Sequence, residues 1–201
     1  ENIEFHLAAG VDFVVAVDNG SVDGTRDILE TYRRAGVAAV IDEPGRDYSQ
    51  DRWVTRAALA ARDEHGADWI LNNDADEFWC AEAGSLKSAL RASEADMLTC
   101  RRRNMVCARE VLHDASWRET LRYRVAQPVA RPALADMLRD PLPVPYFYMD
   151  LPPKVLTRAK GLTEVGMGNH SAVHGAGSRT EPAPIHIYHF PVRGPEHFAR
   201  K

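Results

Sequence analysis

The chain has 201 residues, of which 45% are hydrophobic and 27% charged, and its formal net charge is -4. This length and apolar content suffice for the core of one folded domain, so we treat residues 1–201 as a single domain. Neither sign of charge dominates, and the composition therefore gives no indication of a nucleic-acid partner or an acidic-membrane partner. No apolar stretch approaches the roughly 18 residues of a membrane-spanning helix, and no signal-peptide pattern is present, so no transmembrane segment is expected.

Cysteine and arginine usage adds two expectations. The three cysteines, Cys80, Cys100 and Cys107, are an odd number without zinc-site spacing. We therefore expect reduced thiols and a cytoplasmic location. Three consecutive arginines, residues 101–103, are interpreted as a solvated edge of a strand rather than as an anion site.

Strand and helix patterns alternate over the first hundred residues. The first apolar run is rich in β-branched residues and does not alternate with polar ones, which is typical of a buried parallel strand. Turn and cap residues follow it, and a helical apolar spacing then continues up to Gly36. Strands are predicted at residues 12–19, 38–41, 69–72 and 96–100, and helices at 28–36, 54–66 and 85–95.

The second half of the chain is less regular. Seven prolines between Pro128 and Pro153 divide it into short pieces. Strand-like pieces remain at residues 146–148, 154–157 and 185–190. Alternating strands and helices in the first half predict a parallel α/β sheet, and we expect the second half to share it.

Acidic residues follow two of the predicted strands. Ligands of open α/β sheets collect outside the carboxyl ends of the strands, where Asp18 and Asp74 lie. Asp74 and Asp76 flank one small residue, so their carboxylates can converge on a hard cation that also takes diphosphate oxygens. Such a cation would neutralise a departing nucleoside diphosphate. An Asp-X-Asp triplet alone is weak support, and its pairing with Asp18 strengthens it.

Two motifs resemble those of a known family. The octet Asp18–Thr25 is similar to the Asp-Asp/Asn-Gly-Ser-X-Asp-Gly-Thr signature of glycosyltransferase family 2, and Asp74–Phe78 resembles the Asp-X-Asp-Glu-Phe motif of family-2-like enzymes. Residues 49–53 and 68–71 also look like the segments between these motifs. The resemblance extends over residues 1–80 and is weaker at residues 168–170 and 189–193. It implies a GT-A fold, a Rossmann-like nucleotide-diphospho-sugar transferase with a mostly parallel central sheet flanked by helices.

The resemblance also assigns roles to residues. Residues 1–100 would form the nucleotide-sugar-binding half and residues 101–201 the acceptor-side half. The Asp18 carboxylate would contact the base or ribose, and Asp23 would cap the following helix or contact the donor. Arg52 would face the donor or solvent, and Glu77 would support the site or start a helix. The implied donor-binding residues are Asp18, Asn19, Gly20, Asp23, Gln50, Arg52, Asp74 and Arg193, and the metal ligands are Asp74 and Asp76 with a late histidine.

The histidine and the general base are open. His189 is the first candidate for the metal and His170 the second, whereas His186 would lie on the opposite face of the strand from His189. An inverting transfer needs a base to deprotonate the acceptor hydroxyl. Asp150 and Glu164 are candidates for that base, although each could equally be an ordinary surface carboxylate. Retaining chemistry, which needs no such base, also remains open.

The implied activity is that of a hexosyltransferase. It would move a sugar from a nucleotide-diphosphate donor, UDP-linked by resemblance, to a carbohydrate or other hydroxyl acceptor with Mn2+ or Mg2+. The alternatives are a non-catalytic nucleotide- or carbohydrate-binding module and a metal-dependent nucleotidyltransferase or phosphohydrolase. The first strand of the family is not in the chain, since residues 1–10 look like the helix that follows it, and we expect that strand to be missing.

Overall fold

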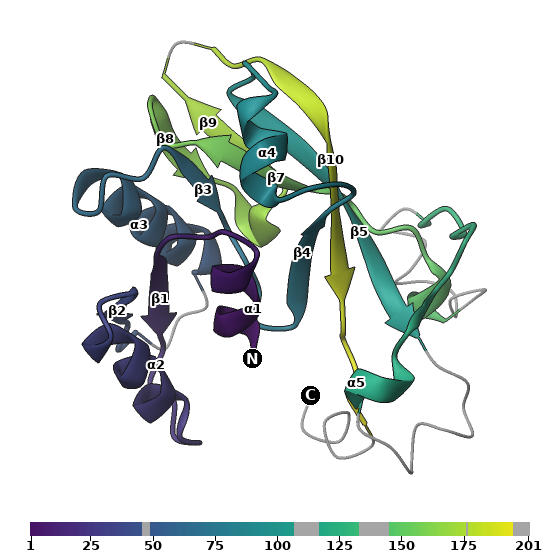
Figure 1. Cartoon of the computed structure of the whole chain (residues 1–201), viewed down its shortest axis with the longest axis horizontal. Coiled ribbons are helices and arrows are strands. Elements are labelled where there is room, and N and C mark those ends of the chain that lie inside the picture. Colours follow the sequence, from purple (N-terminus) through teal and green to yellow (C-terminus); the bar gives the residue numbers. More distant parts are fainter. Residues whose placement is uncertain (46–48, 107–116, 133–144, 176, 195–201) are drawn as a thin grey trace.

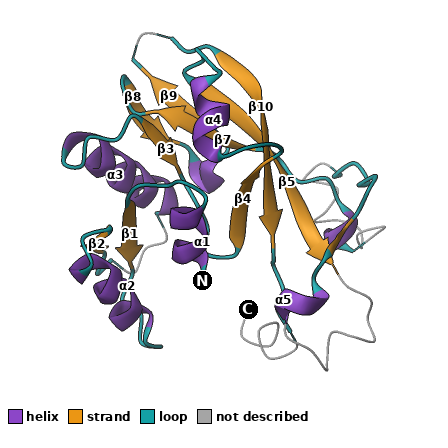
Figure 2. Ribbon diagram, in the orientation of Figure 1, coloured by secondary structure: helices purple, strands orange, loops and turns teal. Residues whose placement is uncertain are grey.

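The structure is a computed structural model that describes residues 1–45, 49–106, 117–132, 145–175 and 177–194. Cys107 lies outside these residues. Five short α-helices and three separate sheets make up the described part (Figure 2). No helix in these ranges is long and apolar enough to cross a membrane.

The first sheet is a parallel pair of strands that carries the first acidic motif. β1 (Val14–Asp18) and β2 (Ala38–Asp42) pair in register from Val14 opposite Ala38 to Asp18 opposite Asp42. α2 (Thr25–Arg34) joins them, and α3 (Gln50–Asp63) packs against β1 (Figure 1). This part confirms the βα unit that the sequence predicts, because local turn and cap signals set each of its boundaries.

The second sheet is a mixed, largely antiparallel sheet of six strands. Its order is β3-β7-β5-β10-β4, and β6 pairs with β5 beside this path. β5 and β10 run parallel, whereas the β3–β7, β7–β5, β5–β6 and β10–β4 pairs are antiparallel. The strands are β3 (Trp69–Leu71), β4 (Glu77–Ala81), β5 (Met97–Val106), β6 (Tyr123–Arg124), β7 (Lys154–Arg158) and β10 (Thr180–His189).

The predicted GT-A fold with a mostly parallel central sheet is therefore wrong. β3 does not join the parallel β1–β2 pair but pairs antiparallel with β7, which follows it by more than eighty residues. Apolar periodicity locates a strand but carries no information on its neighbour or direction, and the inference of a parallel sheet depended on both. The prediction of a strand at residues 146–148 is also wrong, because these residues form a 3-10 turn (Tyr146–Tyr148).

The remaining elements cover the sheets. The side chain of Ser85 accepts a hydrogen bond from the Ser88 backbone N–H, which starts α4 as a capping box does. The short helix α1 packs beside β4, and the β8–β9 hairpin packs against α3. These elements are α1 (Asn2–Ala8), α4 (Leu86–Arg91), α5 (Trp117–Thr120), β8 (Leu162–Val165), β9 (Ala172–His174) and a second 3-10 turn (Met167–Asn169).

The core lies on both faces of the mixed sheet. On the face that α4 covers, Trp79, Cys100, Leu156 and Ile187 are buried together. On the other face, a second cluster joins α3 and the β8–β9 hairpin to β3 and β7. The site described next continues the first cluster.

Candidate functional site

The apolar core beneath α4 ends in a layer of polar side chains. Successive side chains of a strand point to opposite faces, so a residue two positions from a core residue shares its face. Glu77 follows this rule beside Trp79, and Lys154 beside Leu156. The same face of β5 and β10 changes from apolar to polar at the same end of the sheet. We call these residues the polar layer: Glu77, Arg102, Asn104, Lys154 and His189.

Buried charges in the polar layer are paired. Lys154 and Glu77 are both 0% exposed. The Nζ of Lys154 donates to Oε2 of Glu77 and to Oδ2 of Asp74, both at 2.6 Å. Arg102 donates from Nη1 to the other Glu77 oxygen at 3.1 Å. Because an unpaired buried charge is strongly unfavourable, these bonds fix Glu77 and hold the Asp74 carboxylate towards Lys154.

The interpretation of residues 101–103 as a solvated edge holds for Arg101, whose side chain is exposed, but it is wrong for the other two arginines. These residues pair with β10 on one side and lie beyond the last β5–β7 pair, at Cys100. The side chain of Arg102 is 10% exposed and pairs with Glu77, and that of Arg103 is 15% exposed and lies 3.5 Å from Asp150. Three consecutive arginines suggested solvent exposure because the sequence alone does not show which strands and side chains lie beside them.

Asp76 and His189 come together at the mouth of the polar layer. Asp76 Oδ2 lies 3.7 Å from His189 Nε2. The other ring nitrogen, Nδ1, is 2.8 Å from Asn104 Oδ1, an acceptor, so Nδ1 carries a proton and Nε2 is the nitrogen that faces Asp76. The backbone N–H of Phe190 donates to Asp76 O at 2.8 Å and fixes the two segments side by side. Two ligands about 2.0–2.2 Å from one cation can span such a separation.

A divalent cation at this mouth would need further ligands. Within the described residues, no three His, Cys, Asp or Glu side chains form a metal-binding group. Asp74, predicted as a ligand, has its Oδ2 on Lys154. The pair Asp76 and His189 fits a hard cation that completes its shell with oxygens of a bound diphosphate and water. In that arrangement Asp74 would support the site through Lys154.

The acidic loop, residues 73–76, is held by the N-terminal helix. The Asn73 side chain donates to Asn2 Oδ1 at 2.7 Å and accepts from the Trp79 indole N–H at 3.0 Å. Asn2 in turn donates to the Glu77 carbonyl at 2.7 Å. One turn further along α1, His6 Nε2 accepts from the Trp79 backbone N–H at 3.2 Å. α1 thus occupies the free edge of β4 and satisfies backbone groups that a further strand would otherwise pair.

His6 is buried in a neutral form. Its Nδ1 lies 2.8 Å from the Asn2 carbonyl, which accepts only, so Nδ1 carries the proton while Nε2 accepts from Trp79. Burial lowers the pKa of the His6 imidazole, and the hydrogen bond to Asn2 opposes that shift. No sequence pattern indicates this role, because the partner of a histidine on a short helix is known only once the helix is placed against β4.

The second predicted donor element, the Asp18–Thr25 loop, is built from local hydrogen bonds. The Asp18 carboxylate accepts from the Ser21 backbone N–H at 3.0 Å, and its other oxygen lies 3.4 Å from Arg26. The hydrogen bond from Ser21 and the nearby Arg26 guanidinium lower the pKa of Asp18. Asn19 donates to the carbonyls of Glu43 and Gly45, at 2.7 and 2.8 Å.

Two other residues of this loop have structural roles. Gly20 has a φ of +70°, which glycine adopts without the strain of a side chain, so it permits the turn after β1. Asp23 Oδ1 accepts from the Thr25 backbone N–H at 3.2 Å, next to the cap residue Gly24. Hydrogen bonds from the Thr25 hydroxyl and from this N–H lower the pKa of Asp23. The N-cap of α2 is Gly24, and no side chain caps the helix there, so Asp23 supports the first residue of α2 without being its N-cap.

The remaining candidates lie on separate elements. Asp150 is exposed and faces Arg103, whereas Glu164 is on the exposed side of the β8–β9 hairpin. His170 is exposed, and its Nδ1 lies 2.7 Å from the carbonyl of Pro153, the residue before Lys154. Gln50 begins α3, Arg52 is exposed on its first turn, and the Arg193 guanidinium lies 5.8 Å from the Trp117 ring centroid.

His186 lies on the other face of β10 from His189. Its Nε2 is 2.9 Å from Glu82 Oε1.

Comparison with protein-family models, with curated proteins and with solved structures finds no match for this chain. Any account of the function therefore depends on the motifs and on the geometry of the polar layer.

Proposed function

We propose that this protein is a metal-assisted glycosyltransferase that uses a nucleotide-diphosphate sugar as donor. The observation that carries the proposal is the pairing of Asp76 Oδ2 with His189 Nε2, 3.7 Å apart at the mouth of the polar layer. A carboxylate and an imidazole whose Nδ1 is held by Asn104 are suitable ligands for a divalent cation. The resemblance of two motifs to those of family 2 supports the assignment to sugar transfer.

The charge of the site supports a cation and a diphosphate together. The carboxylates of Asp74 and Glu77 are paired with the cations of Lys154 and Arg102, and Asp76 lies beside His189. A divalent cation held by Asp76 and His189 would add positive charge to the site and attract the diphosphate of a donor. Bound there, the cation would supply Lewis-acid stabilisation of the leaving group.

Each residue of the site would have a separate role in binding the donor and the cation. Asp76 and His189 would hold the cation, and Asn104 would orient the His189 ring. Lys154 would keep the Asp74 and Glu77 carboxylates paired and in place. The Asp18 loop would contact the nucleoside part of the donor, and Mn2+ or Mg2+ both fit oxygen and imidazole ligands.

Metal-dependent binding of UDP tests the proposal directly. We expect titration calorimetry to show UDP binding with Mn2+ and a loss of at least about tenfold in affinity with a chelator present. Asp76→Asn keeps the size of the side chain but removes its charge, and it should cause a similar loss. Asp12→Asn is the matched control, because Asp12 is an exposed aspartate paired with Lys87 away from the site. Unchanged Mn2+-dependent UDP binding in Asp76→Asn would contradict the proposal.

A non-catalytic nucleotide-binding module is the second candidate, and one observation favours it. Two carboxylates of the site, Asp74 and Glu77, are bound to Lys154, and the base candidate Asp150 faces Arg103. These ion pairs already engage the carboxylates that would have to accept the proton of an acceptor hydroxyl. UDP-sugar turnover separates the two functions. UDP release from UDP-sugars over hours favours the enzyme, whereas tight Mn2+-dependent UDP binding without any release favours the module.

A further inference from the structure

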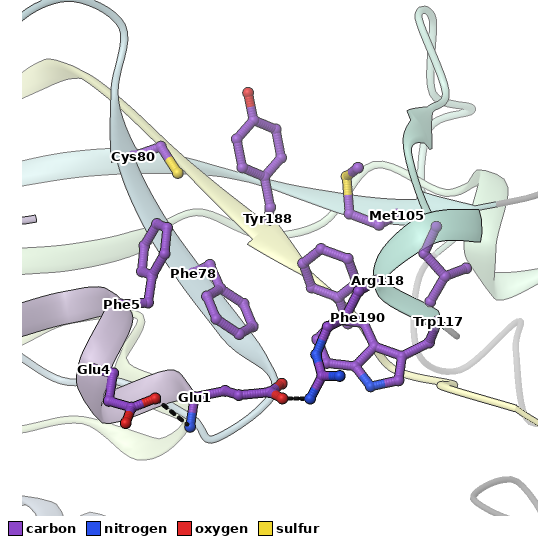
Figure 3. Close-up of a pocket in the computed structure, with 11 residues that line it drawn as sticks. Glu1, Glu4, Phe5, Phe78, Cys80, Met105, Trp117, Arg118, Tyr188 and Phe190 are labelled. Carbon is purple, nitrogen blue, oxygen red and sulfur yellow. Dashed lines mark ion pairs between the residues drawn. The ribbon is translucent and has the colours of Figure 1, made fainter. Parts of the chain in front are cut away.

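A pocket of about 550 Å³ opens on the other face of the sheet from the polar layer. Figure 3 shows aromatic side chains from α1, β4, α5 and the end of β10 around it. We call it the aromatic pocket and define it by Phe5, Phe78, Trp117, Tyr188 and Phe190. Cys80, Met105 and Leu121 add apolar lining.

The aromatic pocket and the candidate metal pair share a wall. On β4, Phe78 follows Glu77 and points to the opposite face, and on β10 Tyr188 precedes His189 in the same way. Phe190 lines the pocket while its backbone N–H binds the Asp76 carbonyl at 2.8 Å. A ligand in the pocket would therefore lie beside the segment that carries Asp76.

The aromatic rings form an edge-to-face arrangement that suits a flat apolar ligand. The ring centroids of Phe5 and Phe78 are 5.0 Å apart, those of Phe78 and Phe190 5.4 Å, and those of Trp117 and Phe190 5.1 Å, all with steep interplanar angles. Aromatic rings attract one another in this geometry, and a further ring can extend the series. The pocket volume is in the range of sites that take small molecules.

The charged groups at the pocket favour an uncharged apolar group over a bare sugar ring. Arg118, which lines the pocket, pairs with Glu1, and Glu4 lies 3.6 Å from the N-terminal ammonium, so these charges offset one another (Figure 3). A sugar ring carries a hydroxyl on most of its carbons and needs several polar partners when it is buried. The wall of this pocket is instead mainly aromatic and aliphatic.

We propose that the aromatic pocket binds the aromatic body of the acceptor, with the acceptor hydroxyl at the edge nearest Asp76. This assignment rests on the proposed function, because only sugar transfer requires an acceptor. It names an acceptor class, an aromatic alcohol or an aryl glycoside, that the two sequence motifs do not specify.

Two ligands that differ only in an aryl group test the proposal. 4-Nitrophenyl β-D-glucoside and methyl β-D-glucoside are titrated into the protein by calorimetry without donor or metal. We expect the aryl glucoside to bind at least about tenfold more tightly than the methyl glucoside. Equal affinities would show that the sugar ring is recognised and would overturn the proposal, as would the absence of aryl glucoside binding.

Matched variants locate the binding. Phe5→Ala removes a ring from the pocket and should weaken aryl glucoside binding by about threefold to tenfold. Phe13→Ala is the control, because Phe13 packs on His65 outside the pocket and should leave the affinity unchanged. Cys80→Phe fills the pocket without removing an aromatic side chain and should abolish binding. Aryl glucoside binding that survives both Phe5→Ala and Cys80→Phe would overturn the proposal.

The result of the aryl glucoside experiment can be distinguished from the result of the UDP and Mn2+ experiment. Aryl glucoside binding in the pocket together with a failure to bind UDP and Mn2+ would contradict the proposed function while the pocket assignment stands as a binding site. UDP and Mn2+ binding without aryl glucoside binding would contradict only the pocket assignment.

Discussion

The two acidic motifs of this chain are held in place in opposite ways. Asp18 is bound by Ser21 and Arg26, which follow it by 3 and 8 residues, at the carboxyl end of β1 in a two-stranded sheet. Asp74 and Glu77 are bound by Lys154, which lies 80 and 77 residues away in sequence. The first motif is a local turn that nearby sequence specifies, whereas the second becomes a site only when distant strands assemble. The predictions below test this difference in stability terms.

Removal of the long-range cation should have the largest effect. In Lys154→Met the carboxylate of Glu77, which is 0% exposed, loses one of its two cationic partners. We expect the free energy of unfolding to fall by about 3–5 kcal/mol, since breaking a buried ion pair leaves an uncompensated charge. Urea denaturation measures this change. Lys87→Met is the matched control, because Lys87 pairs with Asp12 at the surface and such pairs contribute little. Equal losses in the two variants would refute the contrast.

Replacement of His6, which covers the edge of β4, should have the second-largest effect on stability. His6→Leu leaves the buried Trp79 backbone N–H without its acceptor, and we expect a loss of about 1–3 kcal/mol near neutral pH. Because burial lowers the pKa of His6 below the ordinary value of 6.5, the unfolded chain takes up a proton there before the folded chain does. Wild-type stability should therefore fall as the pH drops below 6.5, down to the folded pKa.

The pH dependence distinguishes the role of His6 from a simple packing role. His6→Leu lacks the titrating group, so its deficit relative to wild type should shrink as the pH is lowered from neutrality. Urea titrations at a series of pH values measure the deficit. A deficit that stays constant with pH would mean that His6 contributes through packing alone.

A local effect of smaller size is expected at Asp18. Asp18→Asn removes the charge that strengthens the Ser21 and Arg26 hydrogen bonds, and we expect a loss of about 1–2 kcal/mol near neutral pH. The folded pKa of Asp18 lies below its ordinary value of 3.8 because of the hydrogen bonds from Ser21. The stabilisation is therefore complete above that value and is lost as the pH falls through the folded pKa. Thermal unfolding of both proteins in acid should converge, and a gap that persists in strong acid would contradict this account.

The smallest effect should come from the exposed pair between Arg26 and Asp42. The Arg26 side chain is 40% exposed and that of Asp42 73% exposed. We expect Asp42→Asn to change stability less than Asp18→Asn, and the small difference to disappear at high salt, because screening weakens exposed pairs. Melting temperatures at low and high salt measure this. A large loss that is insensitive to salt would mean that the pair is shielded from solvent.

Local features of the fold were predictable from the sequence. Cap and turn residues located α2, and short apolar runs located β1, β2 and β7. Each of these signals acts within a few residues of the element it sets. Strand order and direction were not predictable in this way, because β3 and β7 read as separate apolar runs until the chain is folded.

The candidate site was predictable in part for the same reason. The acidic residues that follow β1 and β3 were visible as motifs, and the late histidine His189 lies 3.7 Å from Asp76 in the structure. The roles of Lys154 and Arg102 were not visible. Lys154 looked like the polar start of an ordinary strand, and Arg102 like one of three exposed arginines. Only the register of β7 and β5 against the strands beside them shows that both side chains share the face of Glu77.

The position of β10 has a consequence for synthesis on the ribosome. β10 is the strand that joins β4 to β5, and its last residue brings His189 to Asp76. A nascent chain that has not yet reached Thr180 can form the β1–β2 unit, but β4 and β5 still lack the neighbour between them. Unpaired strands are prone to wrong association. We therefore expect the β1–β2 unit to mature during translation, and the Asp76–His189 contact to arise only after β10 has left the exit tunnel.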